Sequence, residues 1–292
     1  MKALFRHYFF RLFKAKSFYA GLLVSAIAGL AFGVILALIN LSAVRNHAYM
    51  LGYDVPLRLA LGASSVSGTS FPYLFVFAVA SVGALYSGDV KSGGFRSCIV
   101  SGYNRKSIYL CHFFSGLLAA EMVGLSFALM MLLCSCFGEF SPVKSSEAGP
   151  LLSSLATLQL LLLSYYACYY FFATITGSAG KGLGIFAALF FILTIFGSFF
   201  PLIYAGIATS REKKKLSYED FQRIGYVISF LPGTHFQHIA QGDFDHLYCS
   251  RTFPSLEGYT LYNYSVMLFE HLGLISAFFC GGLAIFNRRD MK

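Results

Sequence analysis

Two acidic residues lie inside apolar segments, where a charged side chain is costly. Glu121 interrupts the run 107–138, and Glu270, followed by His271, interrupts the run 258–287. Acids within a membrane usually pair with a polar group or face a cavity, and they often mark a functional pathway. We therefore expect Glu121 to be protonated or partnered by a polar group on another helix. Glu270 fits the same role or a position near the outer headgroups.

A second group of side chains could bind metal, because it combines histidine, aspartate and cysteine within fifteen residues. Its members are His235, His238, Asp243, Asp245, His246 and Cys249. Their spacing matches no recognised zinc pattern. We predict no metal site, with His235 and His238 as the weak candidates, and we favour amphipathic helices at the outer membrane surface for this segment.

The segment 177–182, Gly-Ser-Ala-Gly-Lys-Gly, superficially resembles a phosphate-binding loop. The pattern requires a glycine where Ile175 stands and a hydroxyl where Gly182 stands, so it fails twice. A tight turn between two helices is the better interpretation. The chain contains no GxSxG or HExxH motif and no paired carboxylates, so we predict that it is not an enzyme and holds no cofactor. Any work driven by ATP requires ATP and Mg²⁺ on a partner chain.

Long apolar runs must position these residues. The 292-residue chain is 57% hydrophobic and only 12% charged, which is unlike a soluble enzyme or a disordered protein. Its runs exceed the roughly 20 residues that a helix needs to cross the hydrocarbon core, and none alternates like a barrel strand. We predict an all-α membrane protein with a single domain over 1–292. Its six transmembrane helices are expected near 18–41, 66–87, 108–137, 151–176, 183–208 and 264–286.

The distribution of charge orients these helices. With the N-terminus inside, the inner segments hold 13 Lys and Arg against two acids, whereas the outer segments hold nine of each. This asymmetry follows the positive-inside rule and explains the net charge of +9 without nucleic-acid binding. We expect a multi-pass protein of the plasma membrane with both termini cytoplasmic and with residues 209–263 as an extracellular loop.

Small residues recur at every fourth position of the first predicted helix: Gly21, Ser25, Gly29, Gly33 and Ala37. This spacing keeps them on one slowly drifting face and permits close approach of another helix. The face can pack within the chain or across a dimer.

In the fourth predicted helix, Tyr165 and Tyr169 belong to an aromatic band over 165–172, which is either an interfacial girdle or a surface facing an amphipathic substrate.

The order of several motifs resembles the permeases of type-two ABC exporters. The segment 86–112 follows the second predicted helix, and its residues Asp89, Gly93, Gly94, Ser101, Gly102 and Arg105 match the inner loop of that family. The basic aromatic N-terminus, Leu-Pro-Gly at 231–233 and Phe-Asn-Arg-Arg-Asp at 286–290 agree with it. The six-helix pattern extends the resemblance over essentially the whole chain.

The resemblance implies a permease that forms a homodimer or heterodimer and binds two ATPase subunits at its cytoplasmic face. It implies an amphipathic elbow helix over 1–16, a cytoplasmic coupling helix within 88–106, and re-entrant or amphipathic outer helices before the sixth span. Asp89, Gly94, Arg96, Arg105 and Lys106 then become candidates for ATPase coupling. The basic residues among them are otherwise ordinary positive-inside charges.

The function that the resemblance implies is outward movement of an amphipathic peptide, antibiotic or lipid-like molecule. Two other classes stay open. One is a membrane-embedded enzyme that acts on lipid through Glu121 or the outer histidines. The other is a sensor or immunity protein that binds a peptide without transporting it.

Overall fold

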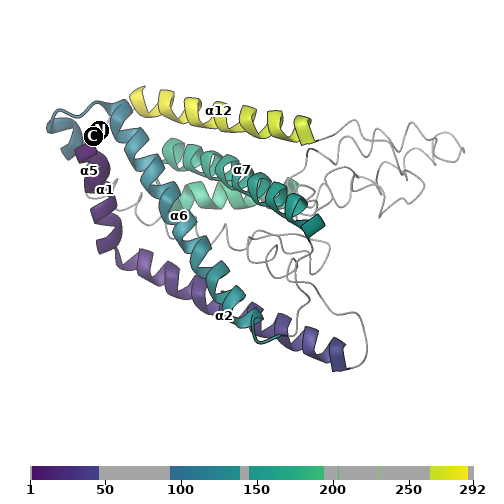
Figure 1. Cartoon of the computed structure of the whole chain (residues 1–292). Coiled ribbons are helices and arrows are strands. Elements are labelled where there is room, and N and C mark those ends of the chain that lie inside the picture. Colours follow the sequence, from purple (N-terminus) through teal and green to yellow (C-terminus); the bar gives the residue numbers. More distant parts are fainter. Residues whose placement is uncertain are drawn as a thin grey trace, which may run out of the picture.

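The structure is a computed structural model that describes residues 2–45, 93–138, 145–193 and 264–288, together with the single positions 203 and 230. Every regular element in these ranges is a helix, which confirms the all-helical prediction for this part of the chain. The helices are α1 (Lys2–Lys14), α2 (Lys16–Arg45), α5 (Gly94–Val100), α6 (Arg105–Ser135), α7 (Ser145–Thr176) and α12 (Tyr264–Arg288), with one more at Ala179–Leu193 (Figure 1).

Among the residues that the structure describes, three helices are long and apolar enough to cross a membrane: Lys16–Ser42, Arg105–Cys134 and Val266–Arg288. They correspond to the first, third and sixth predicted spans and indicate a membrane protein. Helix α7 covers the fourth predicted span, and Ala179–Leu193 covers the beginning of the fifth. The second predicted span at 66–87, residues 194–202 and 204–208 of the fifth, and nearly all of the loop 209–263 lie outside the described residues.

Local sequence explains where these helices begin and end. Helices α1 and α2 are separated by Ala15, whose amide donates to the carbonyl of Leu12 at 3.0 Å. Helix α6 begins after Asn104, whose side-chain oxygen accepts a hydrogen bond from the amide of Lys106 at 3.1 Å, as an N-cap does. Helix α7 ends at Thr176 and is followed by Gly177, where a φ of 63° suits glycine.

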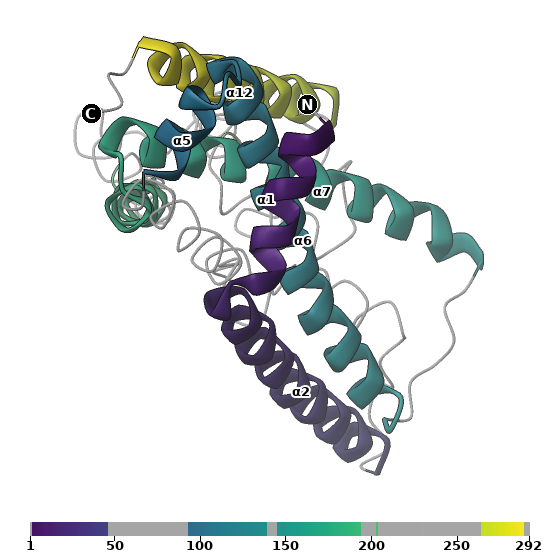
Figure 2. The same ribbon diagram turned by 90° about the vertical axis from the view of Figure 1, so that its left-hand side faces the viewer.

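The helices pack as two main pairs. Helix α2 lies along α6, and α12 lies along α7. The second pair is joined at Ser164, whose hydroxyl lies 2.9 Å from Nδ1 of buried His271. At one end of the molecule, α1, α5, the start of α6 and the last turns of α12 come together (Figures 1 and 2).

A close helix pair follows the turn at Gly177. A Cβ atom at Gly182 would lie 2.5 Å from the backbone nitrogen of Ala173 in α7, whereas a Cβ atom at Gly184 would meet nothing within 4 Å. The absence of a side chain at Gly182 therefore allows the helix Ala179–Leu193 to approach α7. The turn predicted over 177–182 is confined to Gly177 and Ser178, because the next helix already begins at Ala179.

We predict that Gly182→Ala lowers the free energy of unfolding by about 1–3 kcal/mol, because the new methyl group must push two backbones apart. The matched variant Gly184→Ala should be neutral or slightly stabilising, since alanine favours helix formation over glycine. Thermal unfolding of the purified full chain in mild detergent measures both effects. Equal midpoints for the two variants would contradict the close packing.

Candidate functional site

The short helix α5 is attached to the rest of the molecule by its inner face. Phe95 is buried, and its ring lies 5.1 Å from the ring of His112 in α6 and 5.4 Å from that of Phe286 in α12, between centroids. Cys98, one turn later, is also buried, and its Sγ lies 3.8 Å from the hydroxyl of Tyr8 in α1. Spacing of three residues places both side chains on one side of α5.

His112 is the centre of these contacts. Its Nδ1 lies 2.8 Å from the hydroxyl of Tyr170 in α7, and its ring contacts Tyr8 edge-on at 5.3 Å between centroids. His112 and Tyr170 are both buried, so their hydrogen bond is shielded from competition by water. Helices α1, α5, α6, α7 and α12 thus meet around one cluster, which we call the His112 hub and define as Tyr8, Phe95, Cys98, His112, Tyr170 and Phe286.

The outer face of α5 exposes Arg96 and Val100, and Val100 has 80% of its surface accessible. Lys106, the second residue of α6, is also exposed. Gly94 forms the first residue of the helix, directly after Gly93, whose φ is 67°. Because α5 buries one face against the His112 hub and exposes the other, a displacement of α5 would be transmitted to the helices that form the hub. Asp89 lies outside the described residues.

Arg105 is placed differently from Arg96 and Lys106. Its Nη1 donates to the backbone carbonyl of Asn287 at 2.9 Å, so the guanidinium binds the C-terminal end of α12. Such a cation satisfies a helix-end carbonyl and interacts favourably with the helix dipole. The structure therefore gives Arg105 a contact inside the chain, which was not foreseen.

We predict that Arg105→Ala lets the last turn of α12 fray. Losing a charge-assisted hydrogen bond at a helix end costs about 1–2 kcal/mol, so amide exchange over 284–288 should accelerate roughly tenfold. Lys106→Ala removes the neighbouring exposed cation and is the control. Hydrogen exchange read by mass spectrometry separates the two variants, and equal protection in both would remove the assigned contact.

The small-residue ladder of the first span faces α6 within the same chain. Ser25 is buried and donates from Oγ to the carbonyl of Val123 at 2.7 Å. Any Cβ atom at Gly29 would collide with the carbonyl of Phe127, and one at Gly33 would lie 2.6 Å from Cβ of Cys134. Ala37 is buried and Gly21 half-buried. Of the two predicted uses of the ladder, packing within the chain is the one seen.

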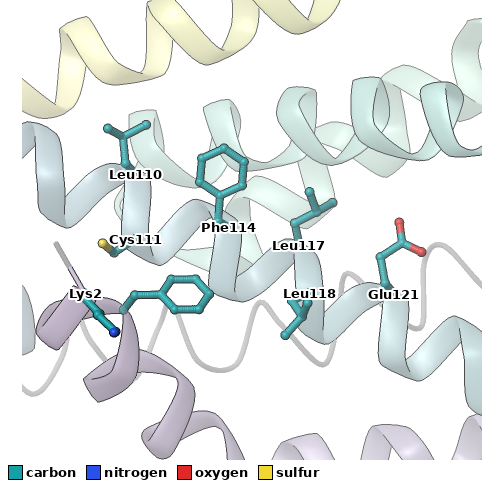
Figure 3. Close-up of a pocket in the computed structure, with 8 residues that line it drawn as sticks. Lys2, Leu110, Cys111, Phe114, Leu117, Leu118 and Glu121 are labelled. Atoms are coloured by element: carbon teal, nitrogen blue, oxygen red, sulfur yellow. The ribbon is translucent and has the colours of Figure 1, made fainter.

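The Glu121 side chain lies within interaction range of the Gln159 side chain of α7. It also lies at the end of a cavity of about 610 Å³ between α1 and α6 (Figure 3). Glu270 is half-buried beside His271, and the contact of His271 with Ser164 joins α12 to α7. The structure does not bring Glu121 and Glu270 together.

The aromatic band of α7 is largely internal. Tyr165 packs edge-on against Phe190 at 5.6 Å between centroids, and Tyr169 contacts Phe186 at 6.5 Å. Both tyrosines are buried, so neither presents an open surface to a substrate in the described part of the molecule. Packing against the helix Ala179–Leu193 explains their positions.

No group of three metal-binding side chains occurs among the residues that the structure describes. His235 and His238 lie outside those residues.

The His112 hub was not predicted from the sequence. The signal that could have revealed its α5 part was the pair of apolar residues three positions apart, Phe95 and Cys98, in the short segment between the second and third predicted spans.

No protein-family model matches the chain, and no curated protein sequence matches it at a significant level.

Proposed function

We propose that this chain is the membrane-spanning permease subunit of an ABC exporter. A separate ATPase would hold ATP and Mg²⁺, and the permease would move an amphipathic peptide, antibiotic or lipid-like molecule outward. The assembly would contain two ATPase subunits and a second permease protomer in the plasma membrane, with both permease termini cytoplasmic. The observation that carries this proposal is α5, a seven-residue helix that buries Phe95 and Cys98 in the His112 hub and exposes Arg96 and Val100 on its other side.

Rigid attachment is what makes α5 suitable for coupling. Close-packed interiors transmit displacement, and rigid-body movement of helices is a common form of conformational change. A displacement of α5 would reach α6 through His112 and α12 through Phe286. Both α6 and α12 are long and apolar enough to cross the membrane.

The outer face of α5 suggests the chemistry of the partner surface. Val100 offers an exposed apolar anchor, and Arg96 on the same helix adds positive charge. Lys106, near the start of α6, is a further exposed cation. Complementary charge orients two proteins, while a central apolar contact contributes most of the binding energy. A groove on the ATPase with an apolar floor and acidic rims would fit.

The proposal predicts that a neighbouring gene encodes the ATPase, and the test is co-purification of the full chain with that ATPase. We expect a complex whose ATP hydrolysis responds to the permease. Val100→Glu combined with Arg96→Glu should abolish this response without lowering the thermal stability of the permease, because both side chains are exposed. Lys16→Glu, a charge reversal at another exposed position, serves as the control.

Two results would overturn the proposal. One is the failure of any complex to form between the two full-length proteins in detergent and in nanodiscs. The other is unchanged coupling in the Val100→Glu, Arg96→Glu double variant. A sensor would also remain functional with an ATPase that cannot hydrolyse ATP, whereas an exporter would not.

A further inference from the structure

An apolar groove lies between the first helix and α6, separate from the His112 hub. Phe5 of α1 forms one wall, and Phe114, Leu117 and Leu118 of α6 form the floor. Lys2 lies at one end and Glu121 at the other, as Figure 3 shows. The volume of about 610 Å³ is within the range of small-molecule sites.

The length of the groove corresponds to one leaflet of a bilayer. Its α6 residues run from Leu110 to Glu121, and at about 1.5 Å per residue this stretch is roughly 16 Å long. The hydrocarbon core of a bilayer is about 30 Å thick, so one leaflet provides about 15 Å. A molecule filling the groove would extend from the level of Lys2 to near the middle of the membrane.

The two ends of the groove differ in charge. Helix α1 carries Lys2, Arg6, Arg11 and Lys14 and no acid. Lys2 and Arg6 are four residues apart, so they lie on the same side of the helix, with Phe5 next to Arg6. At the other end, the Glu121 side chain lies within interaction range of Gln159 of α7. The positive charge available to an occupant is therefore at the α1 end.

Between these ends the groove presents hydrocarbon and aromatic surface. Phe114 and Leu118 are four residues apart on α6, and both are exposed in the structure, at 50% and 39%. An aliphatic chain would cover this surface, and a phosphate would meet the cations of α1. A zwitterionic lipid would make the same aliphatic contact, but the cations of α1 would attract its headgroup less strongly.

We propose that this groove binds one acyl chain of an anionic phospholipid, from the leaflet that borders α1, with the lipid phosphate at Lys2. The chain would lie along Phe114 and Leu118 and end near Glu121. This inference does not depend on the export function, because it concerns only the contacts of α1 and α6.

Native mass spectrometry of the purified full chain can test it, with phosphatidylglycerol and phosphatidylcholine of identical acyl chains in equal amounts. We expect one molecule of phosphatidylglycerol to be retained after partial delipidation, with a preference of about fivefold over phosphatidylcholine, as one surface cation typically provides. Lys2→Glu should abolish the preference, whereas Lys16→Glu, an equal charge change on α2, should leave it largely intact.

A second pair of variants tests the apolar floor. Leu118→Trp should fill the groove and remove the retained lipid of either headgroup. Leu125→Trp, at an exposed position of the same helix, should not. Thermal unfolding confirms that each variant is folded before its lipid binding is compared.

Three outcomes would overturn the proposal. Equal retention of both lipids would remove the headgroup assignment. If Leu118→Trp and Leu125→Trp change the amount of retained lipid equally, the lipid belongs to the general shell around the protein and not to the groove. Retention of a co-purified peptide in place of lipid, lost in Leu118→Trp, would assign the groove to a different occupant.

Discussion

Replacing both Gly29 and Gly33 with alanine should prevent the chain from folding stably. A Cβ atom at Gly29 would overlap the backbone carbonyl of Phe127, and one at Gly33 would lie 2.7 Å from the carbonyl oxygen of Met131. Backbone atoms cannot rotate away as a side chain can, so α2 and α6 must separate. Overpacking typically costs about 1–3 kcal/mol per site, and both sites lie on one interface.

The interface that would be lost also includes hydrogen bonds between the two helices. Ser25 donates to the carbonyl of Val123 at 2.7 Å, and this bond lies one turn from Gly29 along α2. Separation of the backbones would lengthen it. We expect the double variant to give little monodisperse protein after extraction, and each single variant to unfold several degrees below the wild-type chain.

Gly124→Ala provides a matched control on the same pair of helices. A Cβ atom there meets nothing within 4 Å, and alanine favours a helix over glycine by about 1 kcal/mol. This variant should be at least as stable as the wild type. If the double variant at Gly29 and Gly33 unfolds at the wild-type temperature, the contact between α2 and α6 is wrong.

The elements that the sequence predicts best are those that follow from a simple physical requirement. A backbone in lipid must satisfy its own hydrogen bonds, so an uncharged apolar run of sufficient length becomes a helix. Helices α2, α6 and α12 illustrate this, since each covers most or all of its predicted range. The boundary of α6 was missed by three residues because the N-cap Asn104 defines its start.

Which surfaces meet is harder to predict, because periodicity identifies a face of a helix but not its partner. The four-residue ladder from Gly21 to Ala37 predicted a packing face, yet only the structure shows that α6 covers it. Tyr165 and Tyr169 illustrate the same limit. Their aromatic character predicted a membrane-interface or substrate-facing role without a packing partner, and the structure shows that they contact Phe186 and Phe190.

Arg105 and His112 show why single polar residues are hardest to interpret. Positive charge near a helix start is equally consistent with a partner contact and with topology, and nothing local predicts the carbonyl of Asn287, which is 182 residues away. Likewise, the contact of His112 with Tyr170 joins residues 58 positions apart. Such contacts follow from the tertiary arrangement of the helices.

Phe95→Ala should release α5 from the membrane helices while leaving those helices folded. Phe95 is 2% exposed and is the α5 side chain that contacts both His112 and Phe286. Truncation of a buried phenylalanine costs about 3–5 kcal/mol in protein cores. Because α5 has only seven residues, the loss should appear as local opening, with amides over 94–100 exchanging roughly a hundredfold faster or more.

Val100→Ala is the matched control for this variant, because it truncates an apolar side chain of the same helix that is 80% exposed. It should leave exchange over 94–100 unchanged. Phe95→Leu should restore part of the protection, since leucine refills some of the volume. Under the proposed function, Phe95→Ala would also let the ATPase bind and hydrolyse ATP without moving substrate. Unchanged exchange over 94–100 in Phe95→Ala would show that other contacts hold α5 in place. The His112 hub would then not be what couples α5 to α6 and α12.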